Sequence, residues 1–105
     1  MILAHIMAKN KAQALEIINL LMDENLLLQA AISEKTIFQK KTAAGELISE
    51  QRTLIIGKTK GLLFTTINAV LKEKFKDNMP MLYSVPIVYM DEELAALLRE
   101  NTAKV

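Results

Sequence analysis

The alternation of helical and strand-like segments constrains the fold of this chain more than any other feature. Two segments show the i, i+3, i+4, i+7 apolar spacing of an amphipathic helix. The apolar face of the first comprises Ala14, Ile17, Ile18 and Leu21. The apolar face of the second comprises Leu63, Ile67, Val70 and Leu71. Asn10 is placed to cap the first helix, and the second is expected to end near Phe75.

Short runs rich in apolar residues flank both helices and are expected to form strands. They cover residues 2–7, 27–39, 47–58 and 82–89. Residues 40–45 are small or basic and include a glycine, so they are expected to turn the second strand into the third. Pro86 cannot donate to a neighbouring strand, which places the fourth strand at a sheet edge. Asp91 is suited to cap a last helix. The residues of this last helix that face the core are expected to be Leu94, Leu97 and Leu98.

This order of elements predicts an α+β fold in which two β-α-β halves are joined by a hairpin. Right-handed crossovers then give a ferredoxin-like split β-α-β sandwich, with an antiparallel sheet and both main helices on one face. We expect a single domain over residues 1–105. The other face would carry Leu3, Met7, Leu54 or their neighbours. Because 51% of the residues are hydrophobic, we expect this face to contact another copy of the chain.

Composition argues against several functional classes. The net charge is +1, so no basic surface for a nucleic acid or an anionic membrane is expected. Aromatic residues make up 5% of the chain, too few for the base-stacking surface of an RNA-binding domain of this topology. There is no cysteine, which removes disulfides and thiolate chemistry. The apolar N-terminus has no basic segment before it, so we expect a cytoplasmic protein.

No motif in the chain indicates an enzyme. Gly57-Lys58-Thr59 resembles the end of a phosphate-binding loop, but Arg52 stands where that loop needs its first glycine. The only histidine, His5, lies between apolar neighbours and is expected to be structural or to lie at a subunit contact. Arg52 and Arg99 are the only arginines, and neither lies in a glycine-rich loop that could hold a phosphate.

Two small groups of residues are candidates for binding. Met79 and Met81 place two thioethers on one short segment, a soft-ligand arrangement that suits Cu(I), although methionine more often fills gaps in a core. Lys58 at the end of the third strand and Tyr83 in the fourth could close a small ligand cleft. The alternative is a lysine that extends along the surface and a tyrosine at the edge of the core.

Three segments resemble the CutA family of divalent-cation tolerance proteins, in the PII-like superfamily. The first is residues 1–28, where 20–26 correspond to the family's LL-x-E-x-L stretch. The second is residues 45–50 leading into 54–59, which resembles a glycine-led return strand ending in KT. The third is residues 83–87, similar to the family's HPY-x-VP element.

The chain also departs from the CutA pattern. Gln29 stands where the family often has a cysteine, and Met81 and Leu82 replace the histidine and proline before the tyrosine. Residues 41–44 replace a hairpin tip that carries tryptophan. The retained positions that could line a cleft between subunits are Lys58, Glu50 and Tyr83.

The resemblance implies a ferredoxin-like homotrimer that binds a small molecule or metal ion, a divalent cation or copper, without catalysis. Its role would be metal-ion tolerance or PII-like signalling, with the ligand captured between subunits. The alternative hypothesis is a trimeric interaction scaffold without a ligand.

Overall fold

The structure, a computed structural model, describes residues 1–105 and is organised around a four-stranded sheet. The strands are β1 (Ile2–Ala8), β2 (Gln29–Lys41), β3 (Leu47–Thr59) and β4 (Met81–Pro86). Their order across the sheet is β2-β3-β1-β4, and every neighbouring pair is antiparallel. This is the strand order of the ferredoxin-like split β-α-β fold, which confirms the predicted class. Pro86 lies in the edge strand β4, as expected.

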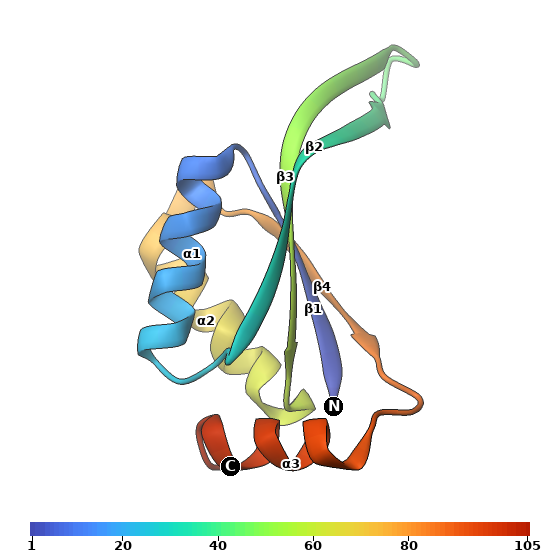
Figure 1. The fold of residues 1–105 in the computed structure, drawn as a ribbon. Coiled ribbons are helices and arrows are strands. Elements are labelled where there is room, and N and C mark those ends of the chain that lie inside the picture. The colour runs from blue at the N-terminus through green and yellow to red at the C-terminus, as the bar shows by residue number, and fades with distance from the viewer.

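Three helices accompany the sheet: α1 (Lys11–Asp23), α2 (Phe64–Phe75) and α3 (Glu92–Asn101). Short 3-10 turns, η1 (Gly61–Leu63) and η2 (Lys76–Asn78), precede and follow α2. Figure 1 shows α1 and α2 together on one side of the sheet, while α3 lies across the end of the sheet nearest the N-terminus. None of these helices is long and apolar enough to cross a membrane.

The predicted helix caps are present. The side-chain oxygen of Asn10 accepts a hydrogen bond from the backbone N–H of Gln13 at 2.9 Å. The carboxylate of Asp91 accepts hydrogen bonds from the backbone N–H groups of Glu93 and Leu94. Each cap satisfies N–H groups that have no partner within the first turn of a helix, so each fixes where its helix begins.

The hydrophobic core lies between the sheet and the helix pair α1 and α2. Its fully buried large side chains include Ile6, Ile17, Leu21, Ile55, Ile67 and Leu71. Gly57 of β3 faces this core, and a Cβ atom at that position would lie 2.8 Å from Cδ2 of Leu27. The close approach of the Leu27 side chain therefore depends on a glycine in β3.

Several element boundaries differ from the sequence prediction. β2 begins at Gln29 rather than residue 27, because the N–H groups of Leu26 and Leu27 still bond the Leu21 carbonyl at the end of α1. β2 also runs on through Lys41, so the turn is confined to residues 42–46. β4 ends at Pro86 rather than residue 89. Beyond it the N–H of Ile87 bonds the Met1 carbonyl and the chain leaves the sheet.

The expectation that Leu97 faces the core is wrong. Its side chain is 42% exposed, whereas Ala95 and Leu98 are buried. α3 lies across the end of the sheet rather than along a face (Figure 1), so only a narrow stripe of the helix is covered.

The β2–β3 hairpin extends well beyond the rest of the sheet. β1 pairs only with residues 53–59 of β3, and the remainder of β3 has β2 as its sole neighbour. We call residues 36–52 the overhang. A register shift between Ser33 and Thr36 lies where the overhang leaves the body, and a bulge of this kind bends a strand pair. Figure 1 shows the overhang projecting away from the helices.

Candidate functional site

The sheet face opposite α1 and α2 has no covering layer, and we call it the open face. Along β1, Ala4, Ile6 and Ala8 are buried against the helices, while the alternate residues Leu3, His5 and Met7 point to the open face and are half-buried. Strand register places further residues on this face: Leu54, Ile56 and Lys58 from β3 and Met81, Tyr83 and Val85 from β4. On these three strands the open face is therefore apolar apart from Lys58, His5 and Tyr83, while β2 adds Gln29, Ala31 and Ser33 at one edge.

Lys58 and Tyr83, both candidate cleft residues, lie on the open face but not in contact. Lys58 is opposite Leu3 on one side of β1, and Tyr83 is opposite His5 on the other. One strand separates them, and they are offset by two positions along it, which together correspond to roughly 12 Å between their backbones. Lys58 lines a shallow hollow of about 270 Å³ together with Ala31 and Ile56.

His5 is the residue whose role the sequence did not reveal. Its Nδ1 lies 3.1 Å from the hydroxyl oxygen of Tyr83, and the two rings are 5.1 Å apart between centroids. The contact joins β1 to β4 across 78 positions of sequence. Spacing along the chain cannot predict such a pair, because it depends on the register between two strands that are distant in sequence.

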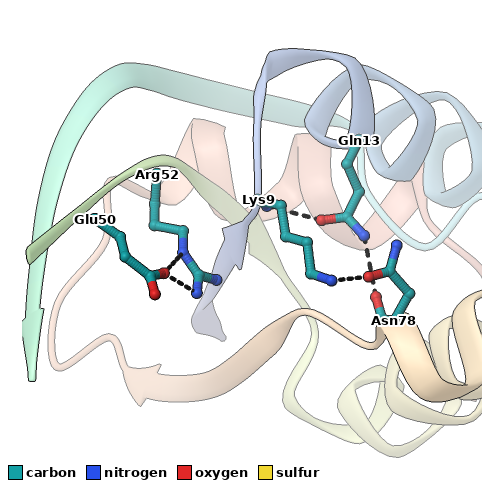
Figure 2. A network of polar contacts seen from close by, with 5 residues as sticks. All are labelled: Lys9, Gln13, Glu50, Arg52 and Asn78. Atoms are coloured by element: carbon teal, nitrogen blue, oxygen red, sulfur yellow. Dashed lines mark hydrogen bonds and ion pairs between the residues drawn. The ribbon is translucent and has the colours of Figure 1, made fainter. Parts of the chain in front are cut away.

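Glu50, the third candidate, lies in the overhang and far from the other two. It is eight residues before Lys58 in β3, a separation of roughly 26 Å along an extended strand. Its carboxylate pairs with Arg52, whose Nε donates to Oε2 at 2.8 Å. The Arg52 guanidinium also lies over the ring of Phe38, 5.5 Å from its centroid. Figure 2 shows Glu50 and Arg52 facing each other.

The electrostatics of Glu50 follow from this contact. The hydrogen bond from Arg52 is the main cause that lowers the pKa of Glu50 below 4.5. Desolvation opposes this shift, while the charges of Arg52, Lys40 and Lys9 add to it. Glu50 is therefore held as a carboxylate, already paired within its own chain.

A second polar network in Figure 2 is structural. The backbone N–H of Lys9 donates to Oε1 of Gln13 at 2.8 Å, and Nε2 of Gln13 donates to the Asn78 carbonyl at 3.1 Å. The Lys9 ammonium also contacts Oδ1 of Asn78. These bonds satisfy both ends of the buried Gln13 amide and tie the start of α1 to η2.

The two methionines proposed as soft ligands occupy different environments. Met79 packs against the hydrophobic core. Met81 begins β4, is 43% exposed, and lies directly opposite Met7 on the open face. The methionine that lies opposite Met81 in the sheet is therefore Met7, on β1.

The largest hollow lies away from the predicted cleft residues. It measures about 750 Å³ and lies where η1 meets α3 and the chain termini, lined in part by Lys60, Leu62 and Arg99. These cations already have partners. Lys60 donates to the Ala103 carbonyl at 2.8 Å, and Arg99 pairs with Glu92 at 3.2 Å. They hold the C-terminal segment in place, and the hollow is open to solvent.

The sheet order, the helix placement, the long hairpin and the C-terminal helix together define a ferredoxin-like architecture. Solved structures agree with this class at the level of fold. The chain superimposes on CutA1 from Oryza sativa with a TM-score of 0.89 and 17% identity, over 99% of this chain and 94% of that one. The divalent cation tolerance protein CutA1 of Thermus thermophilus gives 0.87 and 24%, over 98% and 100%.

A third comparison extends the same result. The periplasmic divalent cation tolerance protein CutA of Archaeoglobus fulgidus gives a TM-score of 0.81 and 20% identity, over 96% of this chain and 98% of that one. The chain therefore has the fold of the CutA1 divalent cation tolerance proteins, and the resemblance seen in its sequence is confirmed at that level. No sequence-family model and no curated protein sequence matches the chain.

Proposed function

We propose that this chain is a CutA-like binding protein that works as a homotrimer and holds a small ligand or metal ion between its subunits. The observation that carries the proposal is the open face. Most of the residues that β1, β3 and β4 present on this face are apolar, and no element of the same chain covers them. Burying such a surface against another copy contributes about 25 cal/mol per Å² of apolar area removed from water.

The overhang supports the same proposal. Ile37 and Leu47 are 67% and 69% exposed on the part of the hairpin that projects beyond β1. A projecting two-stranded ribbon is marginally stable by itself, so packing of the overhang against a neighbouring copy would stabilise it. A heterologous contact of this kind closes into a ring when the rotation between copies permits. The resemblance of the sequence to the CutA family implies a ring of three.

In such a ring a binding cleft would combine residues that are far apart in one chain. Lys58 and Tyr83 lie on the sheet body, while Glu50 lies on the overhang. An overhang from the next copy is the element that would bring a Glu50 toward Lys58. Ligand binding and assembly would then be coupled, because anything that binds only the assembled form stabilises it.

The role we assign is binding and regulation rather than catalysis, in metal-ion tolerance or PII-like signalling. A bound ligand would be sensed through the overhang, which carries Lys40 and Lys41 near its tip. We place the protein in the cytoplasm. Fractionation of the source cells tests that location. Recovery with periplasmic markers, the compartment of the Archaeoglobus fulgidus CutA protein, would contradict it.

Calorimetric titration of the purified protein with Cu²⁺, Zn²⁺ and ATP tests the binding role. We expect heat of binding for at least one of them, reduced in Lys58→Ala. The matched control is Lys72→Ala, which removes an exposed lysine on α2, away from the open face. No binding of any of the three, by an assembled protein, would instead favour the interaction scaffold.

A further inference from the structure

We propose that the chain binds a phosphate or phosphoryl group in a polar hollow at the base of the overhang, which we call the basal hollow. The basal hollow has a volume of about 270 Å³, and no hydrophobic side chain lines it. Its charged lining residues are Lys9, Lys11, Glu34, Lys35 and Arg52. The site goes beyond the proposed function, because it lies within one chain and none of the candidate cleft residues lines it.

Three segments that are distant in the sequence form the basal hollow. Lys9 follows β1, and Lys11 is the first residue of α1. Lys35 comes from β2 and Arg52 from β3, at the level where β1 ends and the overhang leaves the body of the sheet. The fold therefore gathers four cations at one place, and their spacing in the sequence does not predict this.

A bulge in β2 helps to form the basal hollow. Between the paired residues Ser33 and Thr36, Glu34 and Lys35 together stand opposite the single residue Thr53 of β3. The Thr53 hydroxyl donates to the Glu34 carbonyl at 3.5 Å. Bulges redirect side chains and are common beside active sites. This bulge is where Lys35 joins the lining of the hollow.

Positive charge is concentrated in the basal hollow. Four cations and one carboxylate line it, an excess of three positive charges, whereas the whole chain has a net charge of +1. Glu34 pairs with Lys11 at 2.9 Å. Lys35 forms no ion pair, and the Lys9 ammonium contacts the uncharged Oδ1 of Asn78. Like charges that are held close together repel, so a bound anion would stabilise this region.

Arg52 is held in a fixed orientation at the basal hollow. Its Nε and Nη2 both donate to one oxygen of Glu50, and its guanidinium lies over the ring of Phe38. Nη1 forms no hydrogen bond, so its N–H groups are free to donate. Figure 2 shows Glu50 on one side of the guanidinium and Lys9 on the other. Counting Glu50, which does not line the hollow, still leaves an excess of two positive charges.

The size and the donors of the basal hollow favour a phosphate group. Its volume lies below the roughly 300–1,000 Å³ of pockets for drug-sized molecules, so it suits one tetrahedral oxyanion rather than a whole organic ligand. Phosphate oxygens accept strong hydrogen bonds from arginine and lysine. The first turn of α1 contains no acidic residue, so the positive end of the helix dipole adds to the attraction. Inorganic phosphate and phosphate monoesters share this chemistry.

The competing explanation is that these side chains form only a solvated basic surface. Such a surface attracts anions weakly and without saturation, and every exposed lysine of the chain would contribute to a similar extent. In a binding site the effect depends on which charge is changed. Removing Glu34, the only carboxylate in the lining, would then strengthen phosphate binding, whereas removing Lys35 would weaken it.

The test is calorimetric titration with inorganic phosphate and, separately, with glycerol 3-phosphate, in a phosphate-free buffer at constant ionic strength. We expect one anion bound per chain. Arg52→Gln should weaken binding about tenfold and Lys35→Gln about threefold, because each removes a charge-assisted hydrogen bond. Glu34→Gln should strengthen binding about threefold. Lys35→Arg keeps the charge and should restore binding to within about twofold of wild type.

The matched control is Lys72→Gln, which removes one positive charge from α2, away from the basal hollow. Its affinity should stay within about twofold of wild type, because salt screens charges at a distance. Backbone amide NMR shifts during the phosphate titration should centre on Lys11, Lys35 and Arg52. Tighter binding of glycerol 3-phosphate would assign the site to organic phosphates and equal binding to free phosphate, and both support the site.

Three results would overturn the proposal. They are the absence of saturable binding of either anion, amide shifts centred on another part of the chain, and equal losses in Lys35→Gln and Lys72→Gln. Binding of ATP separates this site from the proposed cleft, since Lys35→Gln would weaken binding in the basal hollow and Lys58→Ala would weaken binding in the cleft.

Light scattering on the same samples tests assembly independently. A trimer that does not bind phosphate contradicts the basal hollow and leaves the proposed function standing. A monomer that binds phosphate through Lys35 and Arg52 supports the hollow and contradicts binding between subunits.

Discussion

The imidazole Nδ1 of His5 lies 3.1 Å from the hydroxyl oxygen of Tyr83, although 78 positions separate the two residues in the sequence. The contact forms because β1 and β4 pair with His5 directly opposite Tyr83. Both residues point to the face of the sheet that no helix covers. The one histidine and one of the two tyrosines of the chain are thereby brought together at the centre of the candidate site.

Replacing Tyr83 by phenylalanine tests this pair. Tyr83→Phe removes the hydroxyl, so we expect a change in the tautomer ratio of the His5 ring, measured from its ¹⁵N chemical shifts. Because the pair is exposed, the free energy of unfolding should fall by no more than about 1 kcal/mol. Tyr89→Phe is the control, since Tyr89 is 87% exposed. His5 spectra that are identical in wild type and Tyr83→Phe would contradict the contact.

The close packing at Gly57 predicts that alanine destabilises the fold more at this position than at Gly61. In Gly57→Ala the new Cβ would meet Cδ2 of Leu27 at 2.8 Å, so we expect a loss of about 1–3 kcal/mol in the free energy of unfolding. In Gly61→Ala the nearest atom is Cγ2 of Ile2 at 3.7 Å, an ordinary contact. Gly61→Ala should therefore cost much less. Urea denaturation of both variants measures the difference, and equal losses would contradict the packing described for β3.

Two leucines on α1 test the location of the core. Leu21 is fully buried, and Leu21→Ala is expected to cost about 2–5 kcal/mol through lost transfer energy and a cavity. Leu15 is 42% exposed on the same helix, so Leu15→Ala should cost less than about 1 kcal/mol. Thermal or chemical denaturation checks both values. A larger loss at Leu15 would mean that the outer side of α1 is covered in the assembled protein.

The contact between Arg52 and Glu50 predicts that removing the Arg52 guanidinium changes the pKa of Glu50. Arg52→Gln should raise the pKa of Glu50 toward 4.5, because the main cause of its lowered pKa is the hydrogen bond from Arg52. Carboxyl ¹³C shifts followed through a pH titration measure this. Arg99→Gln, which removes the partner of Glu92 on α3, is the control and should leave Glu50 unchanged.

The sign of the linked stability change follows from the lowered pKa. A carboxyl group with a lowered pKa in the folded state contributes stability above its unfolded pKa, and this contribution is lost as pH falls through the folded pKa. Wild type should therefore exceed Arg52→Gln in stability at neutral pH, and the difference should shrink in acid. The effect will be small, since the pair is near the surface. A difference that grows in acid would contradict the assignment.

Local sequence patterns predicted the helices and strands well, because helix periodicity and helix capping depend on residues that are close together in the chain. The apolar spacing of Ile17 and Leu21 and the caps at Asn10 and Asp91 are all present in the structure. Boundaries were less accurate where tertiary contacts decide them. The start of β2 depends on bonds from Leu26 and Leu27 to the end of α1, and the exposure of Leu97 depends on where α3 docks.

The candidate site was only partly predictable. Apolar alternation in the sequence predicts that Lys58 and Tyr83 lie in strands. Only the pairing of β1 with β3 and β4 shows that both residues lie on the open face, on either side of the strand that carries His5. Likewise Met79 and Met81 are neighbours in sequence, yet the structure separates them and sets Met81 against Met7. Pairing between distant strands carries this information, and spacing within a motif does not.

The proposed assembly requires other copies of the chain to cover the open face. Size-exclusion chromatography with multi-angle light scattering, at micromolar concentration, measures the mass of the assembled particle. We expect three times the 11.8 kDa chain mass. A stable particle with the mass of one chain would contradict it.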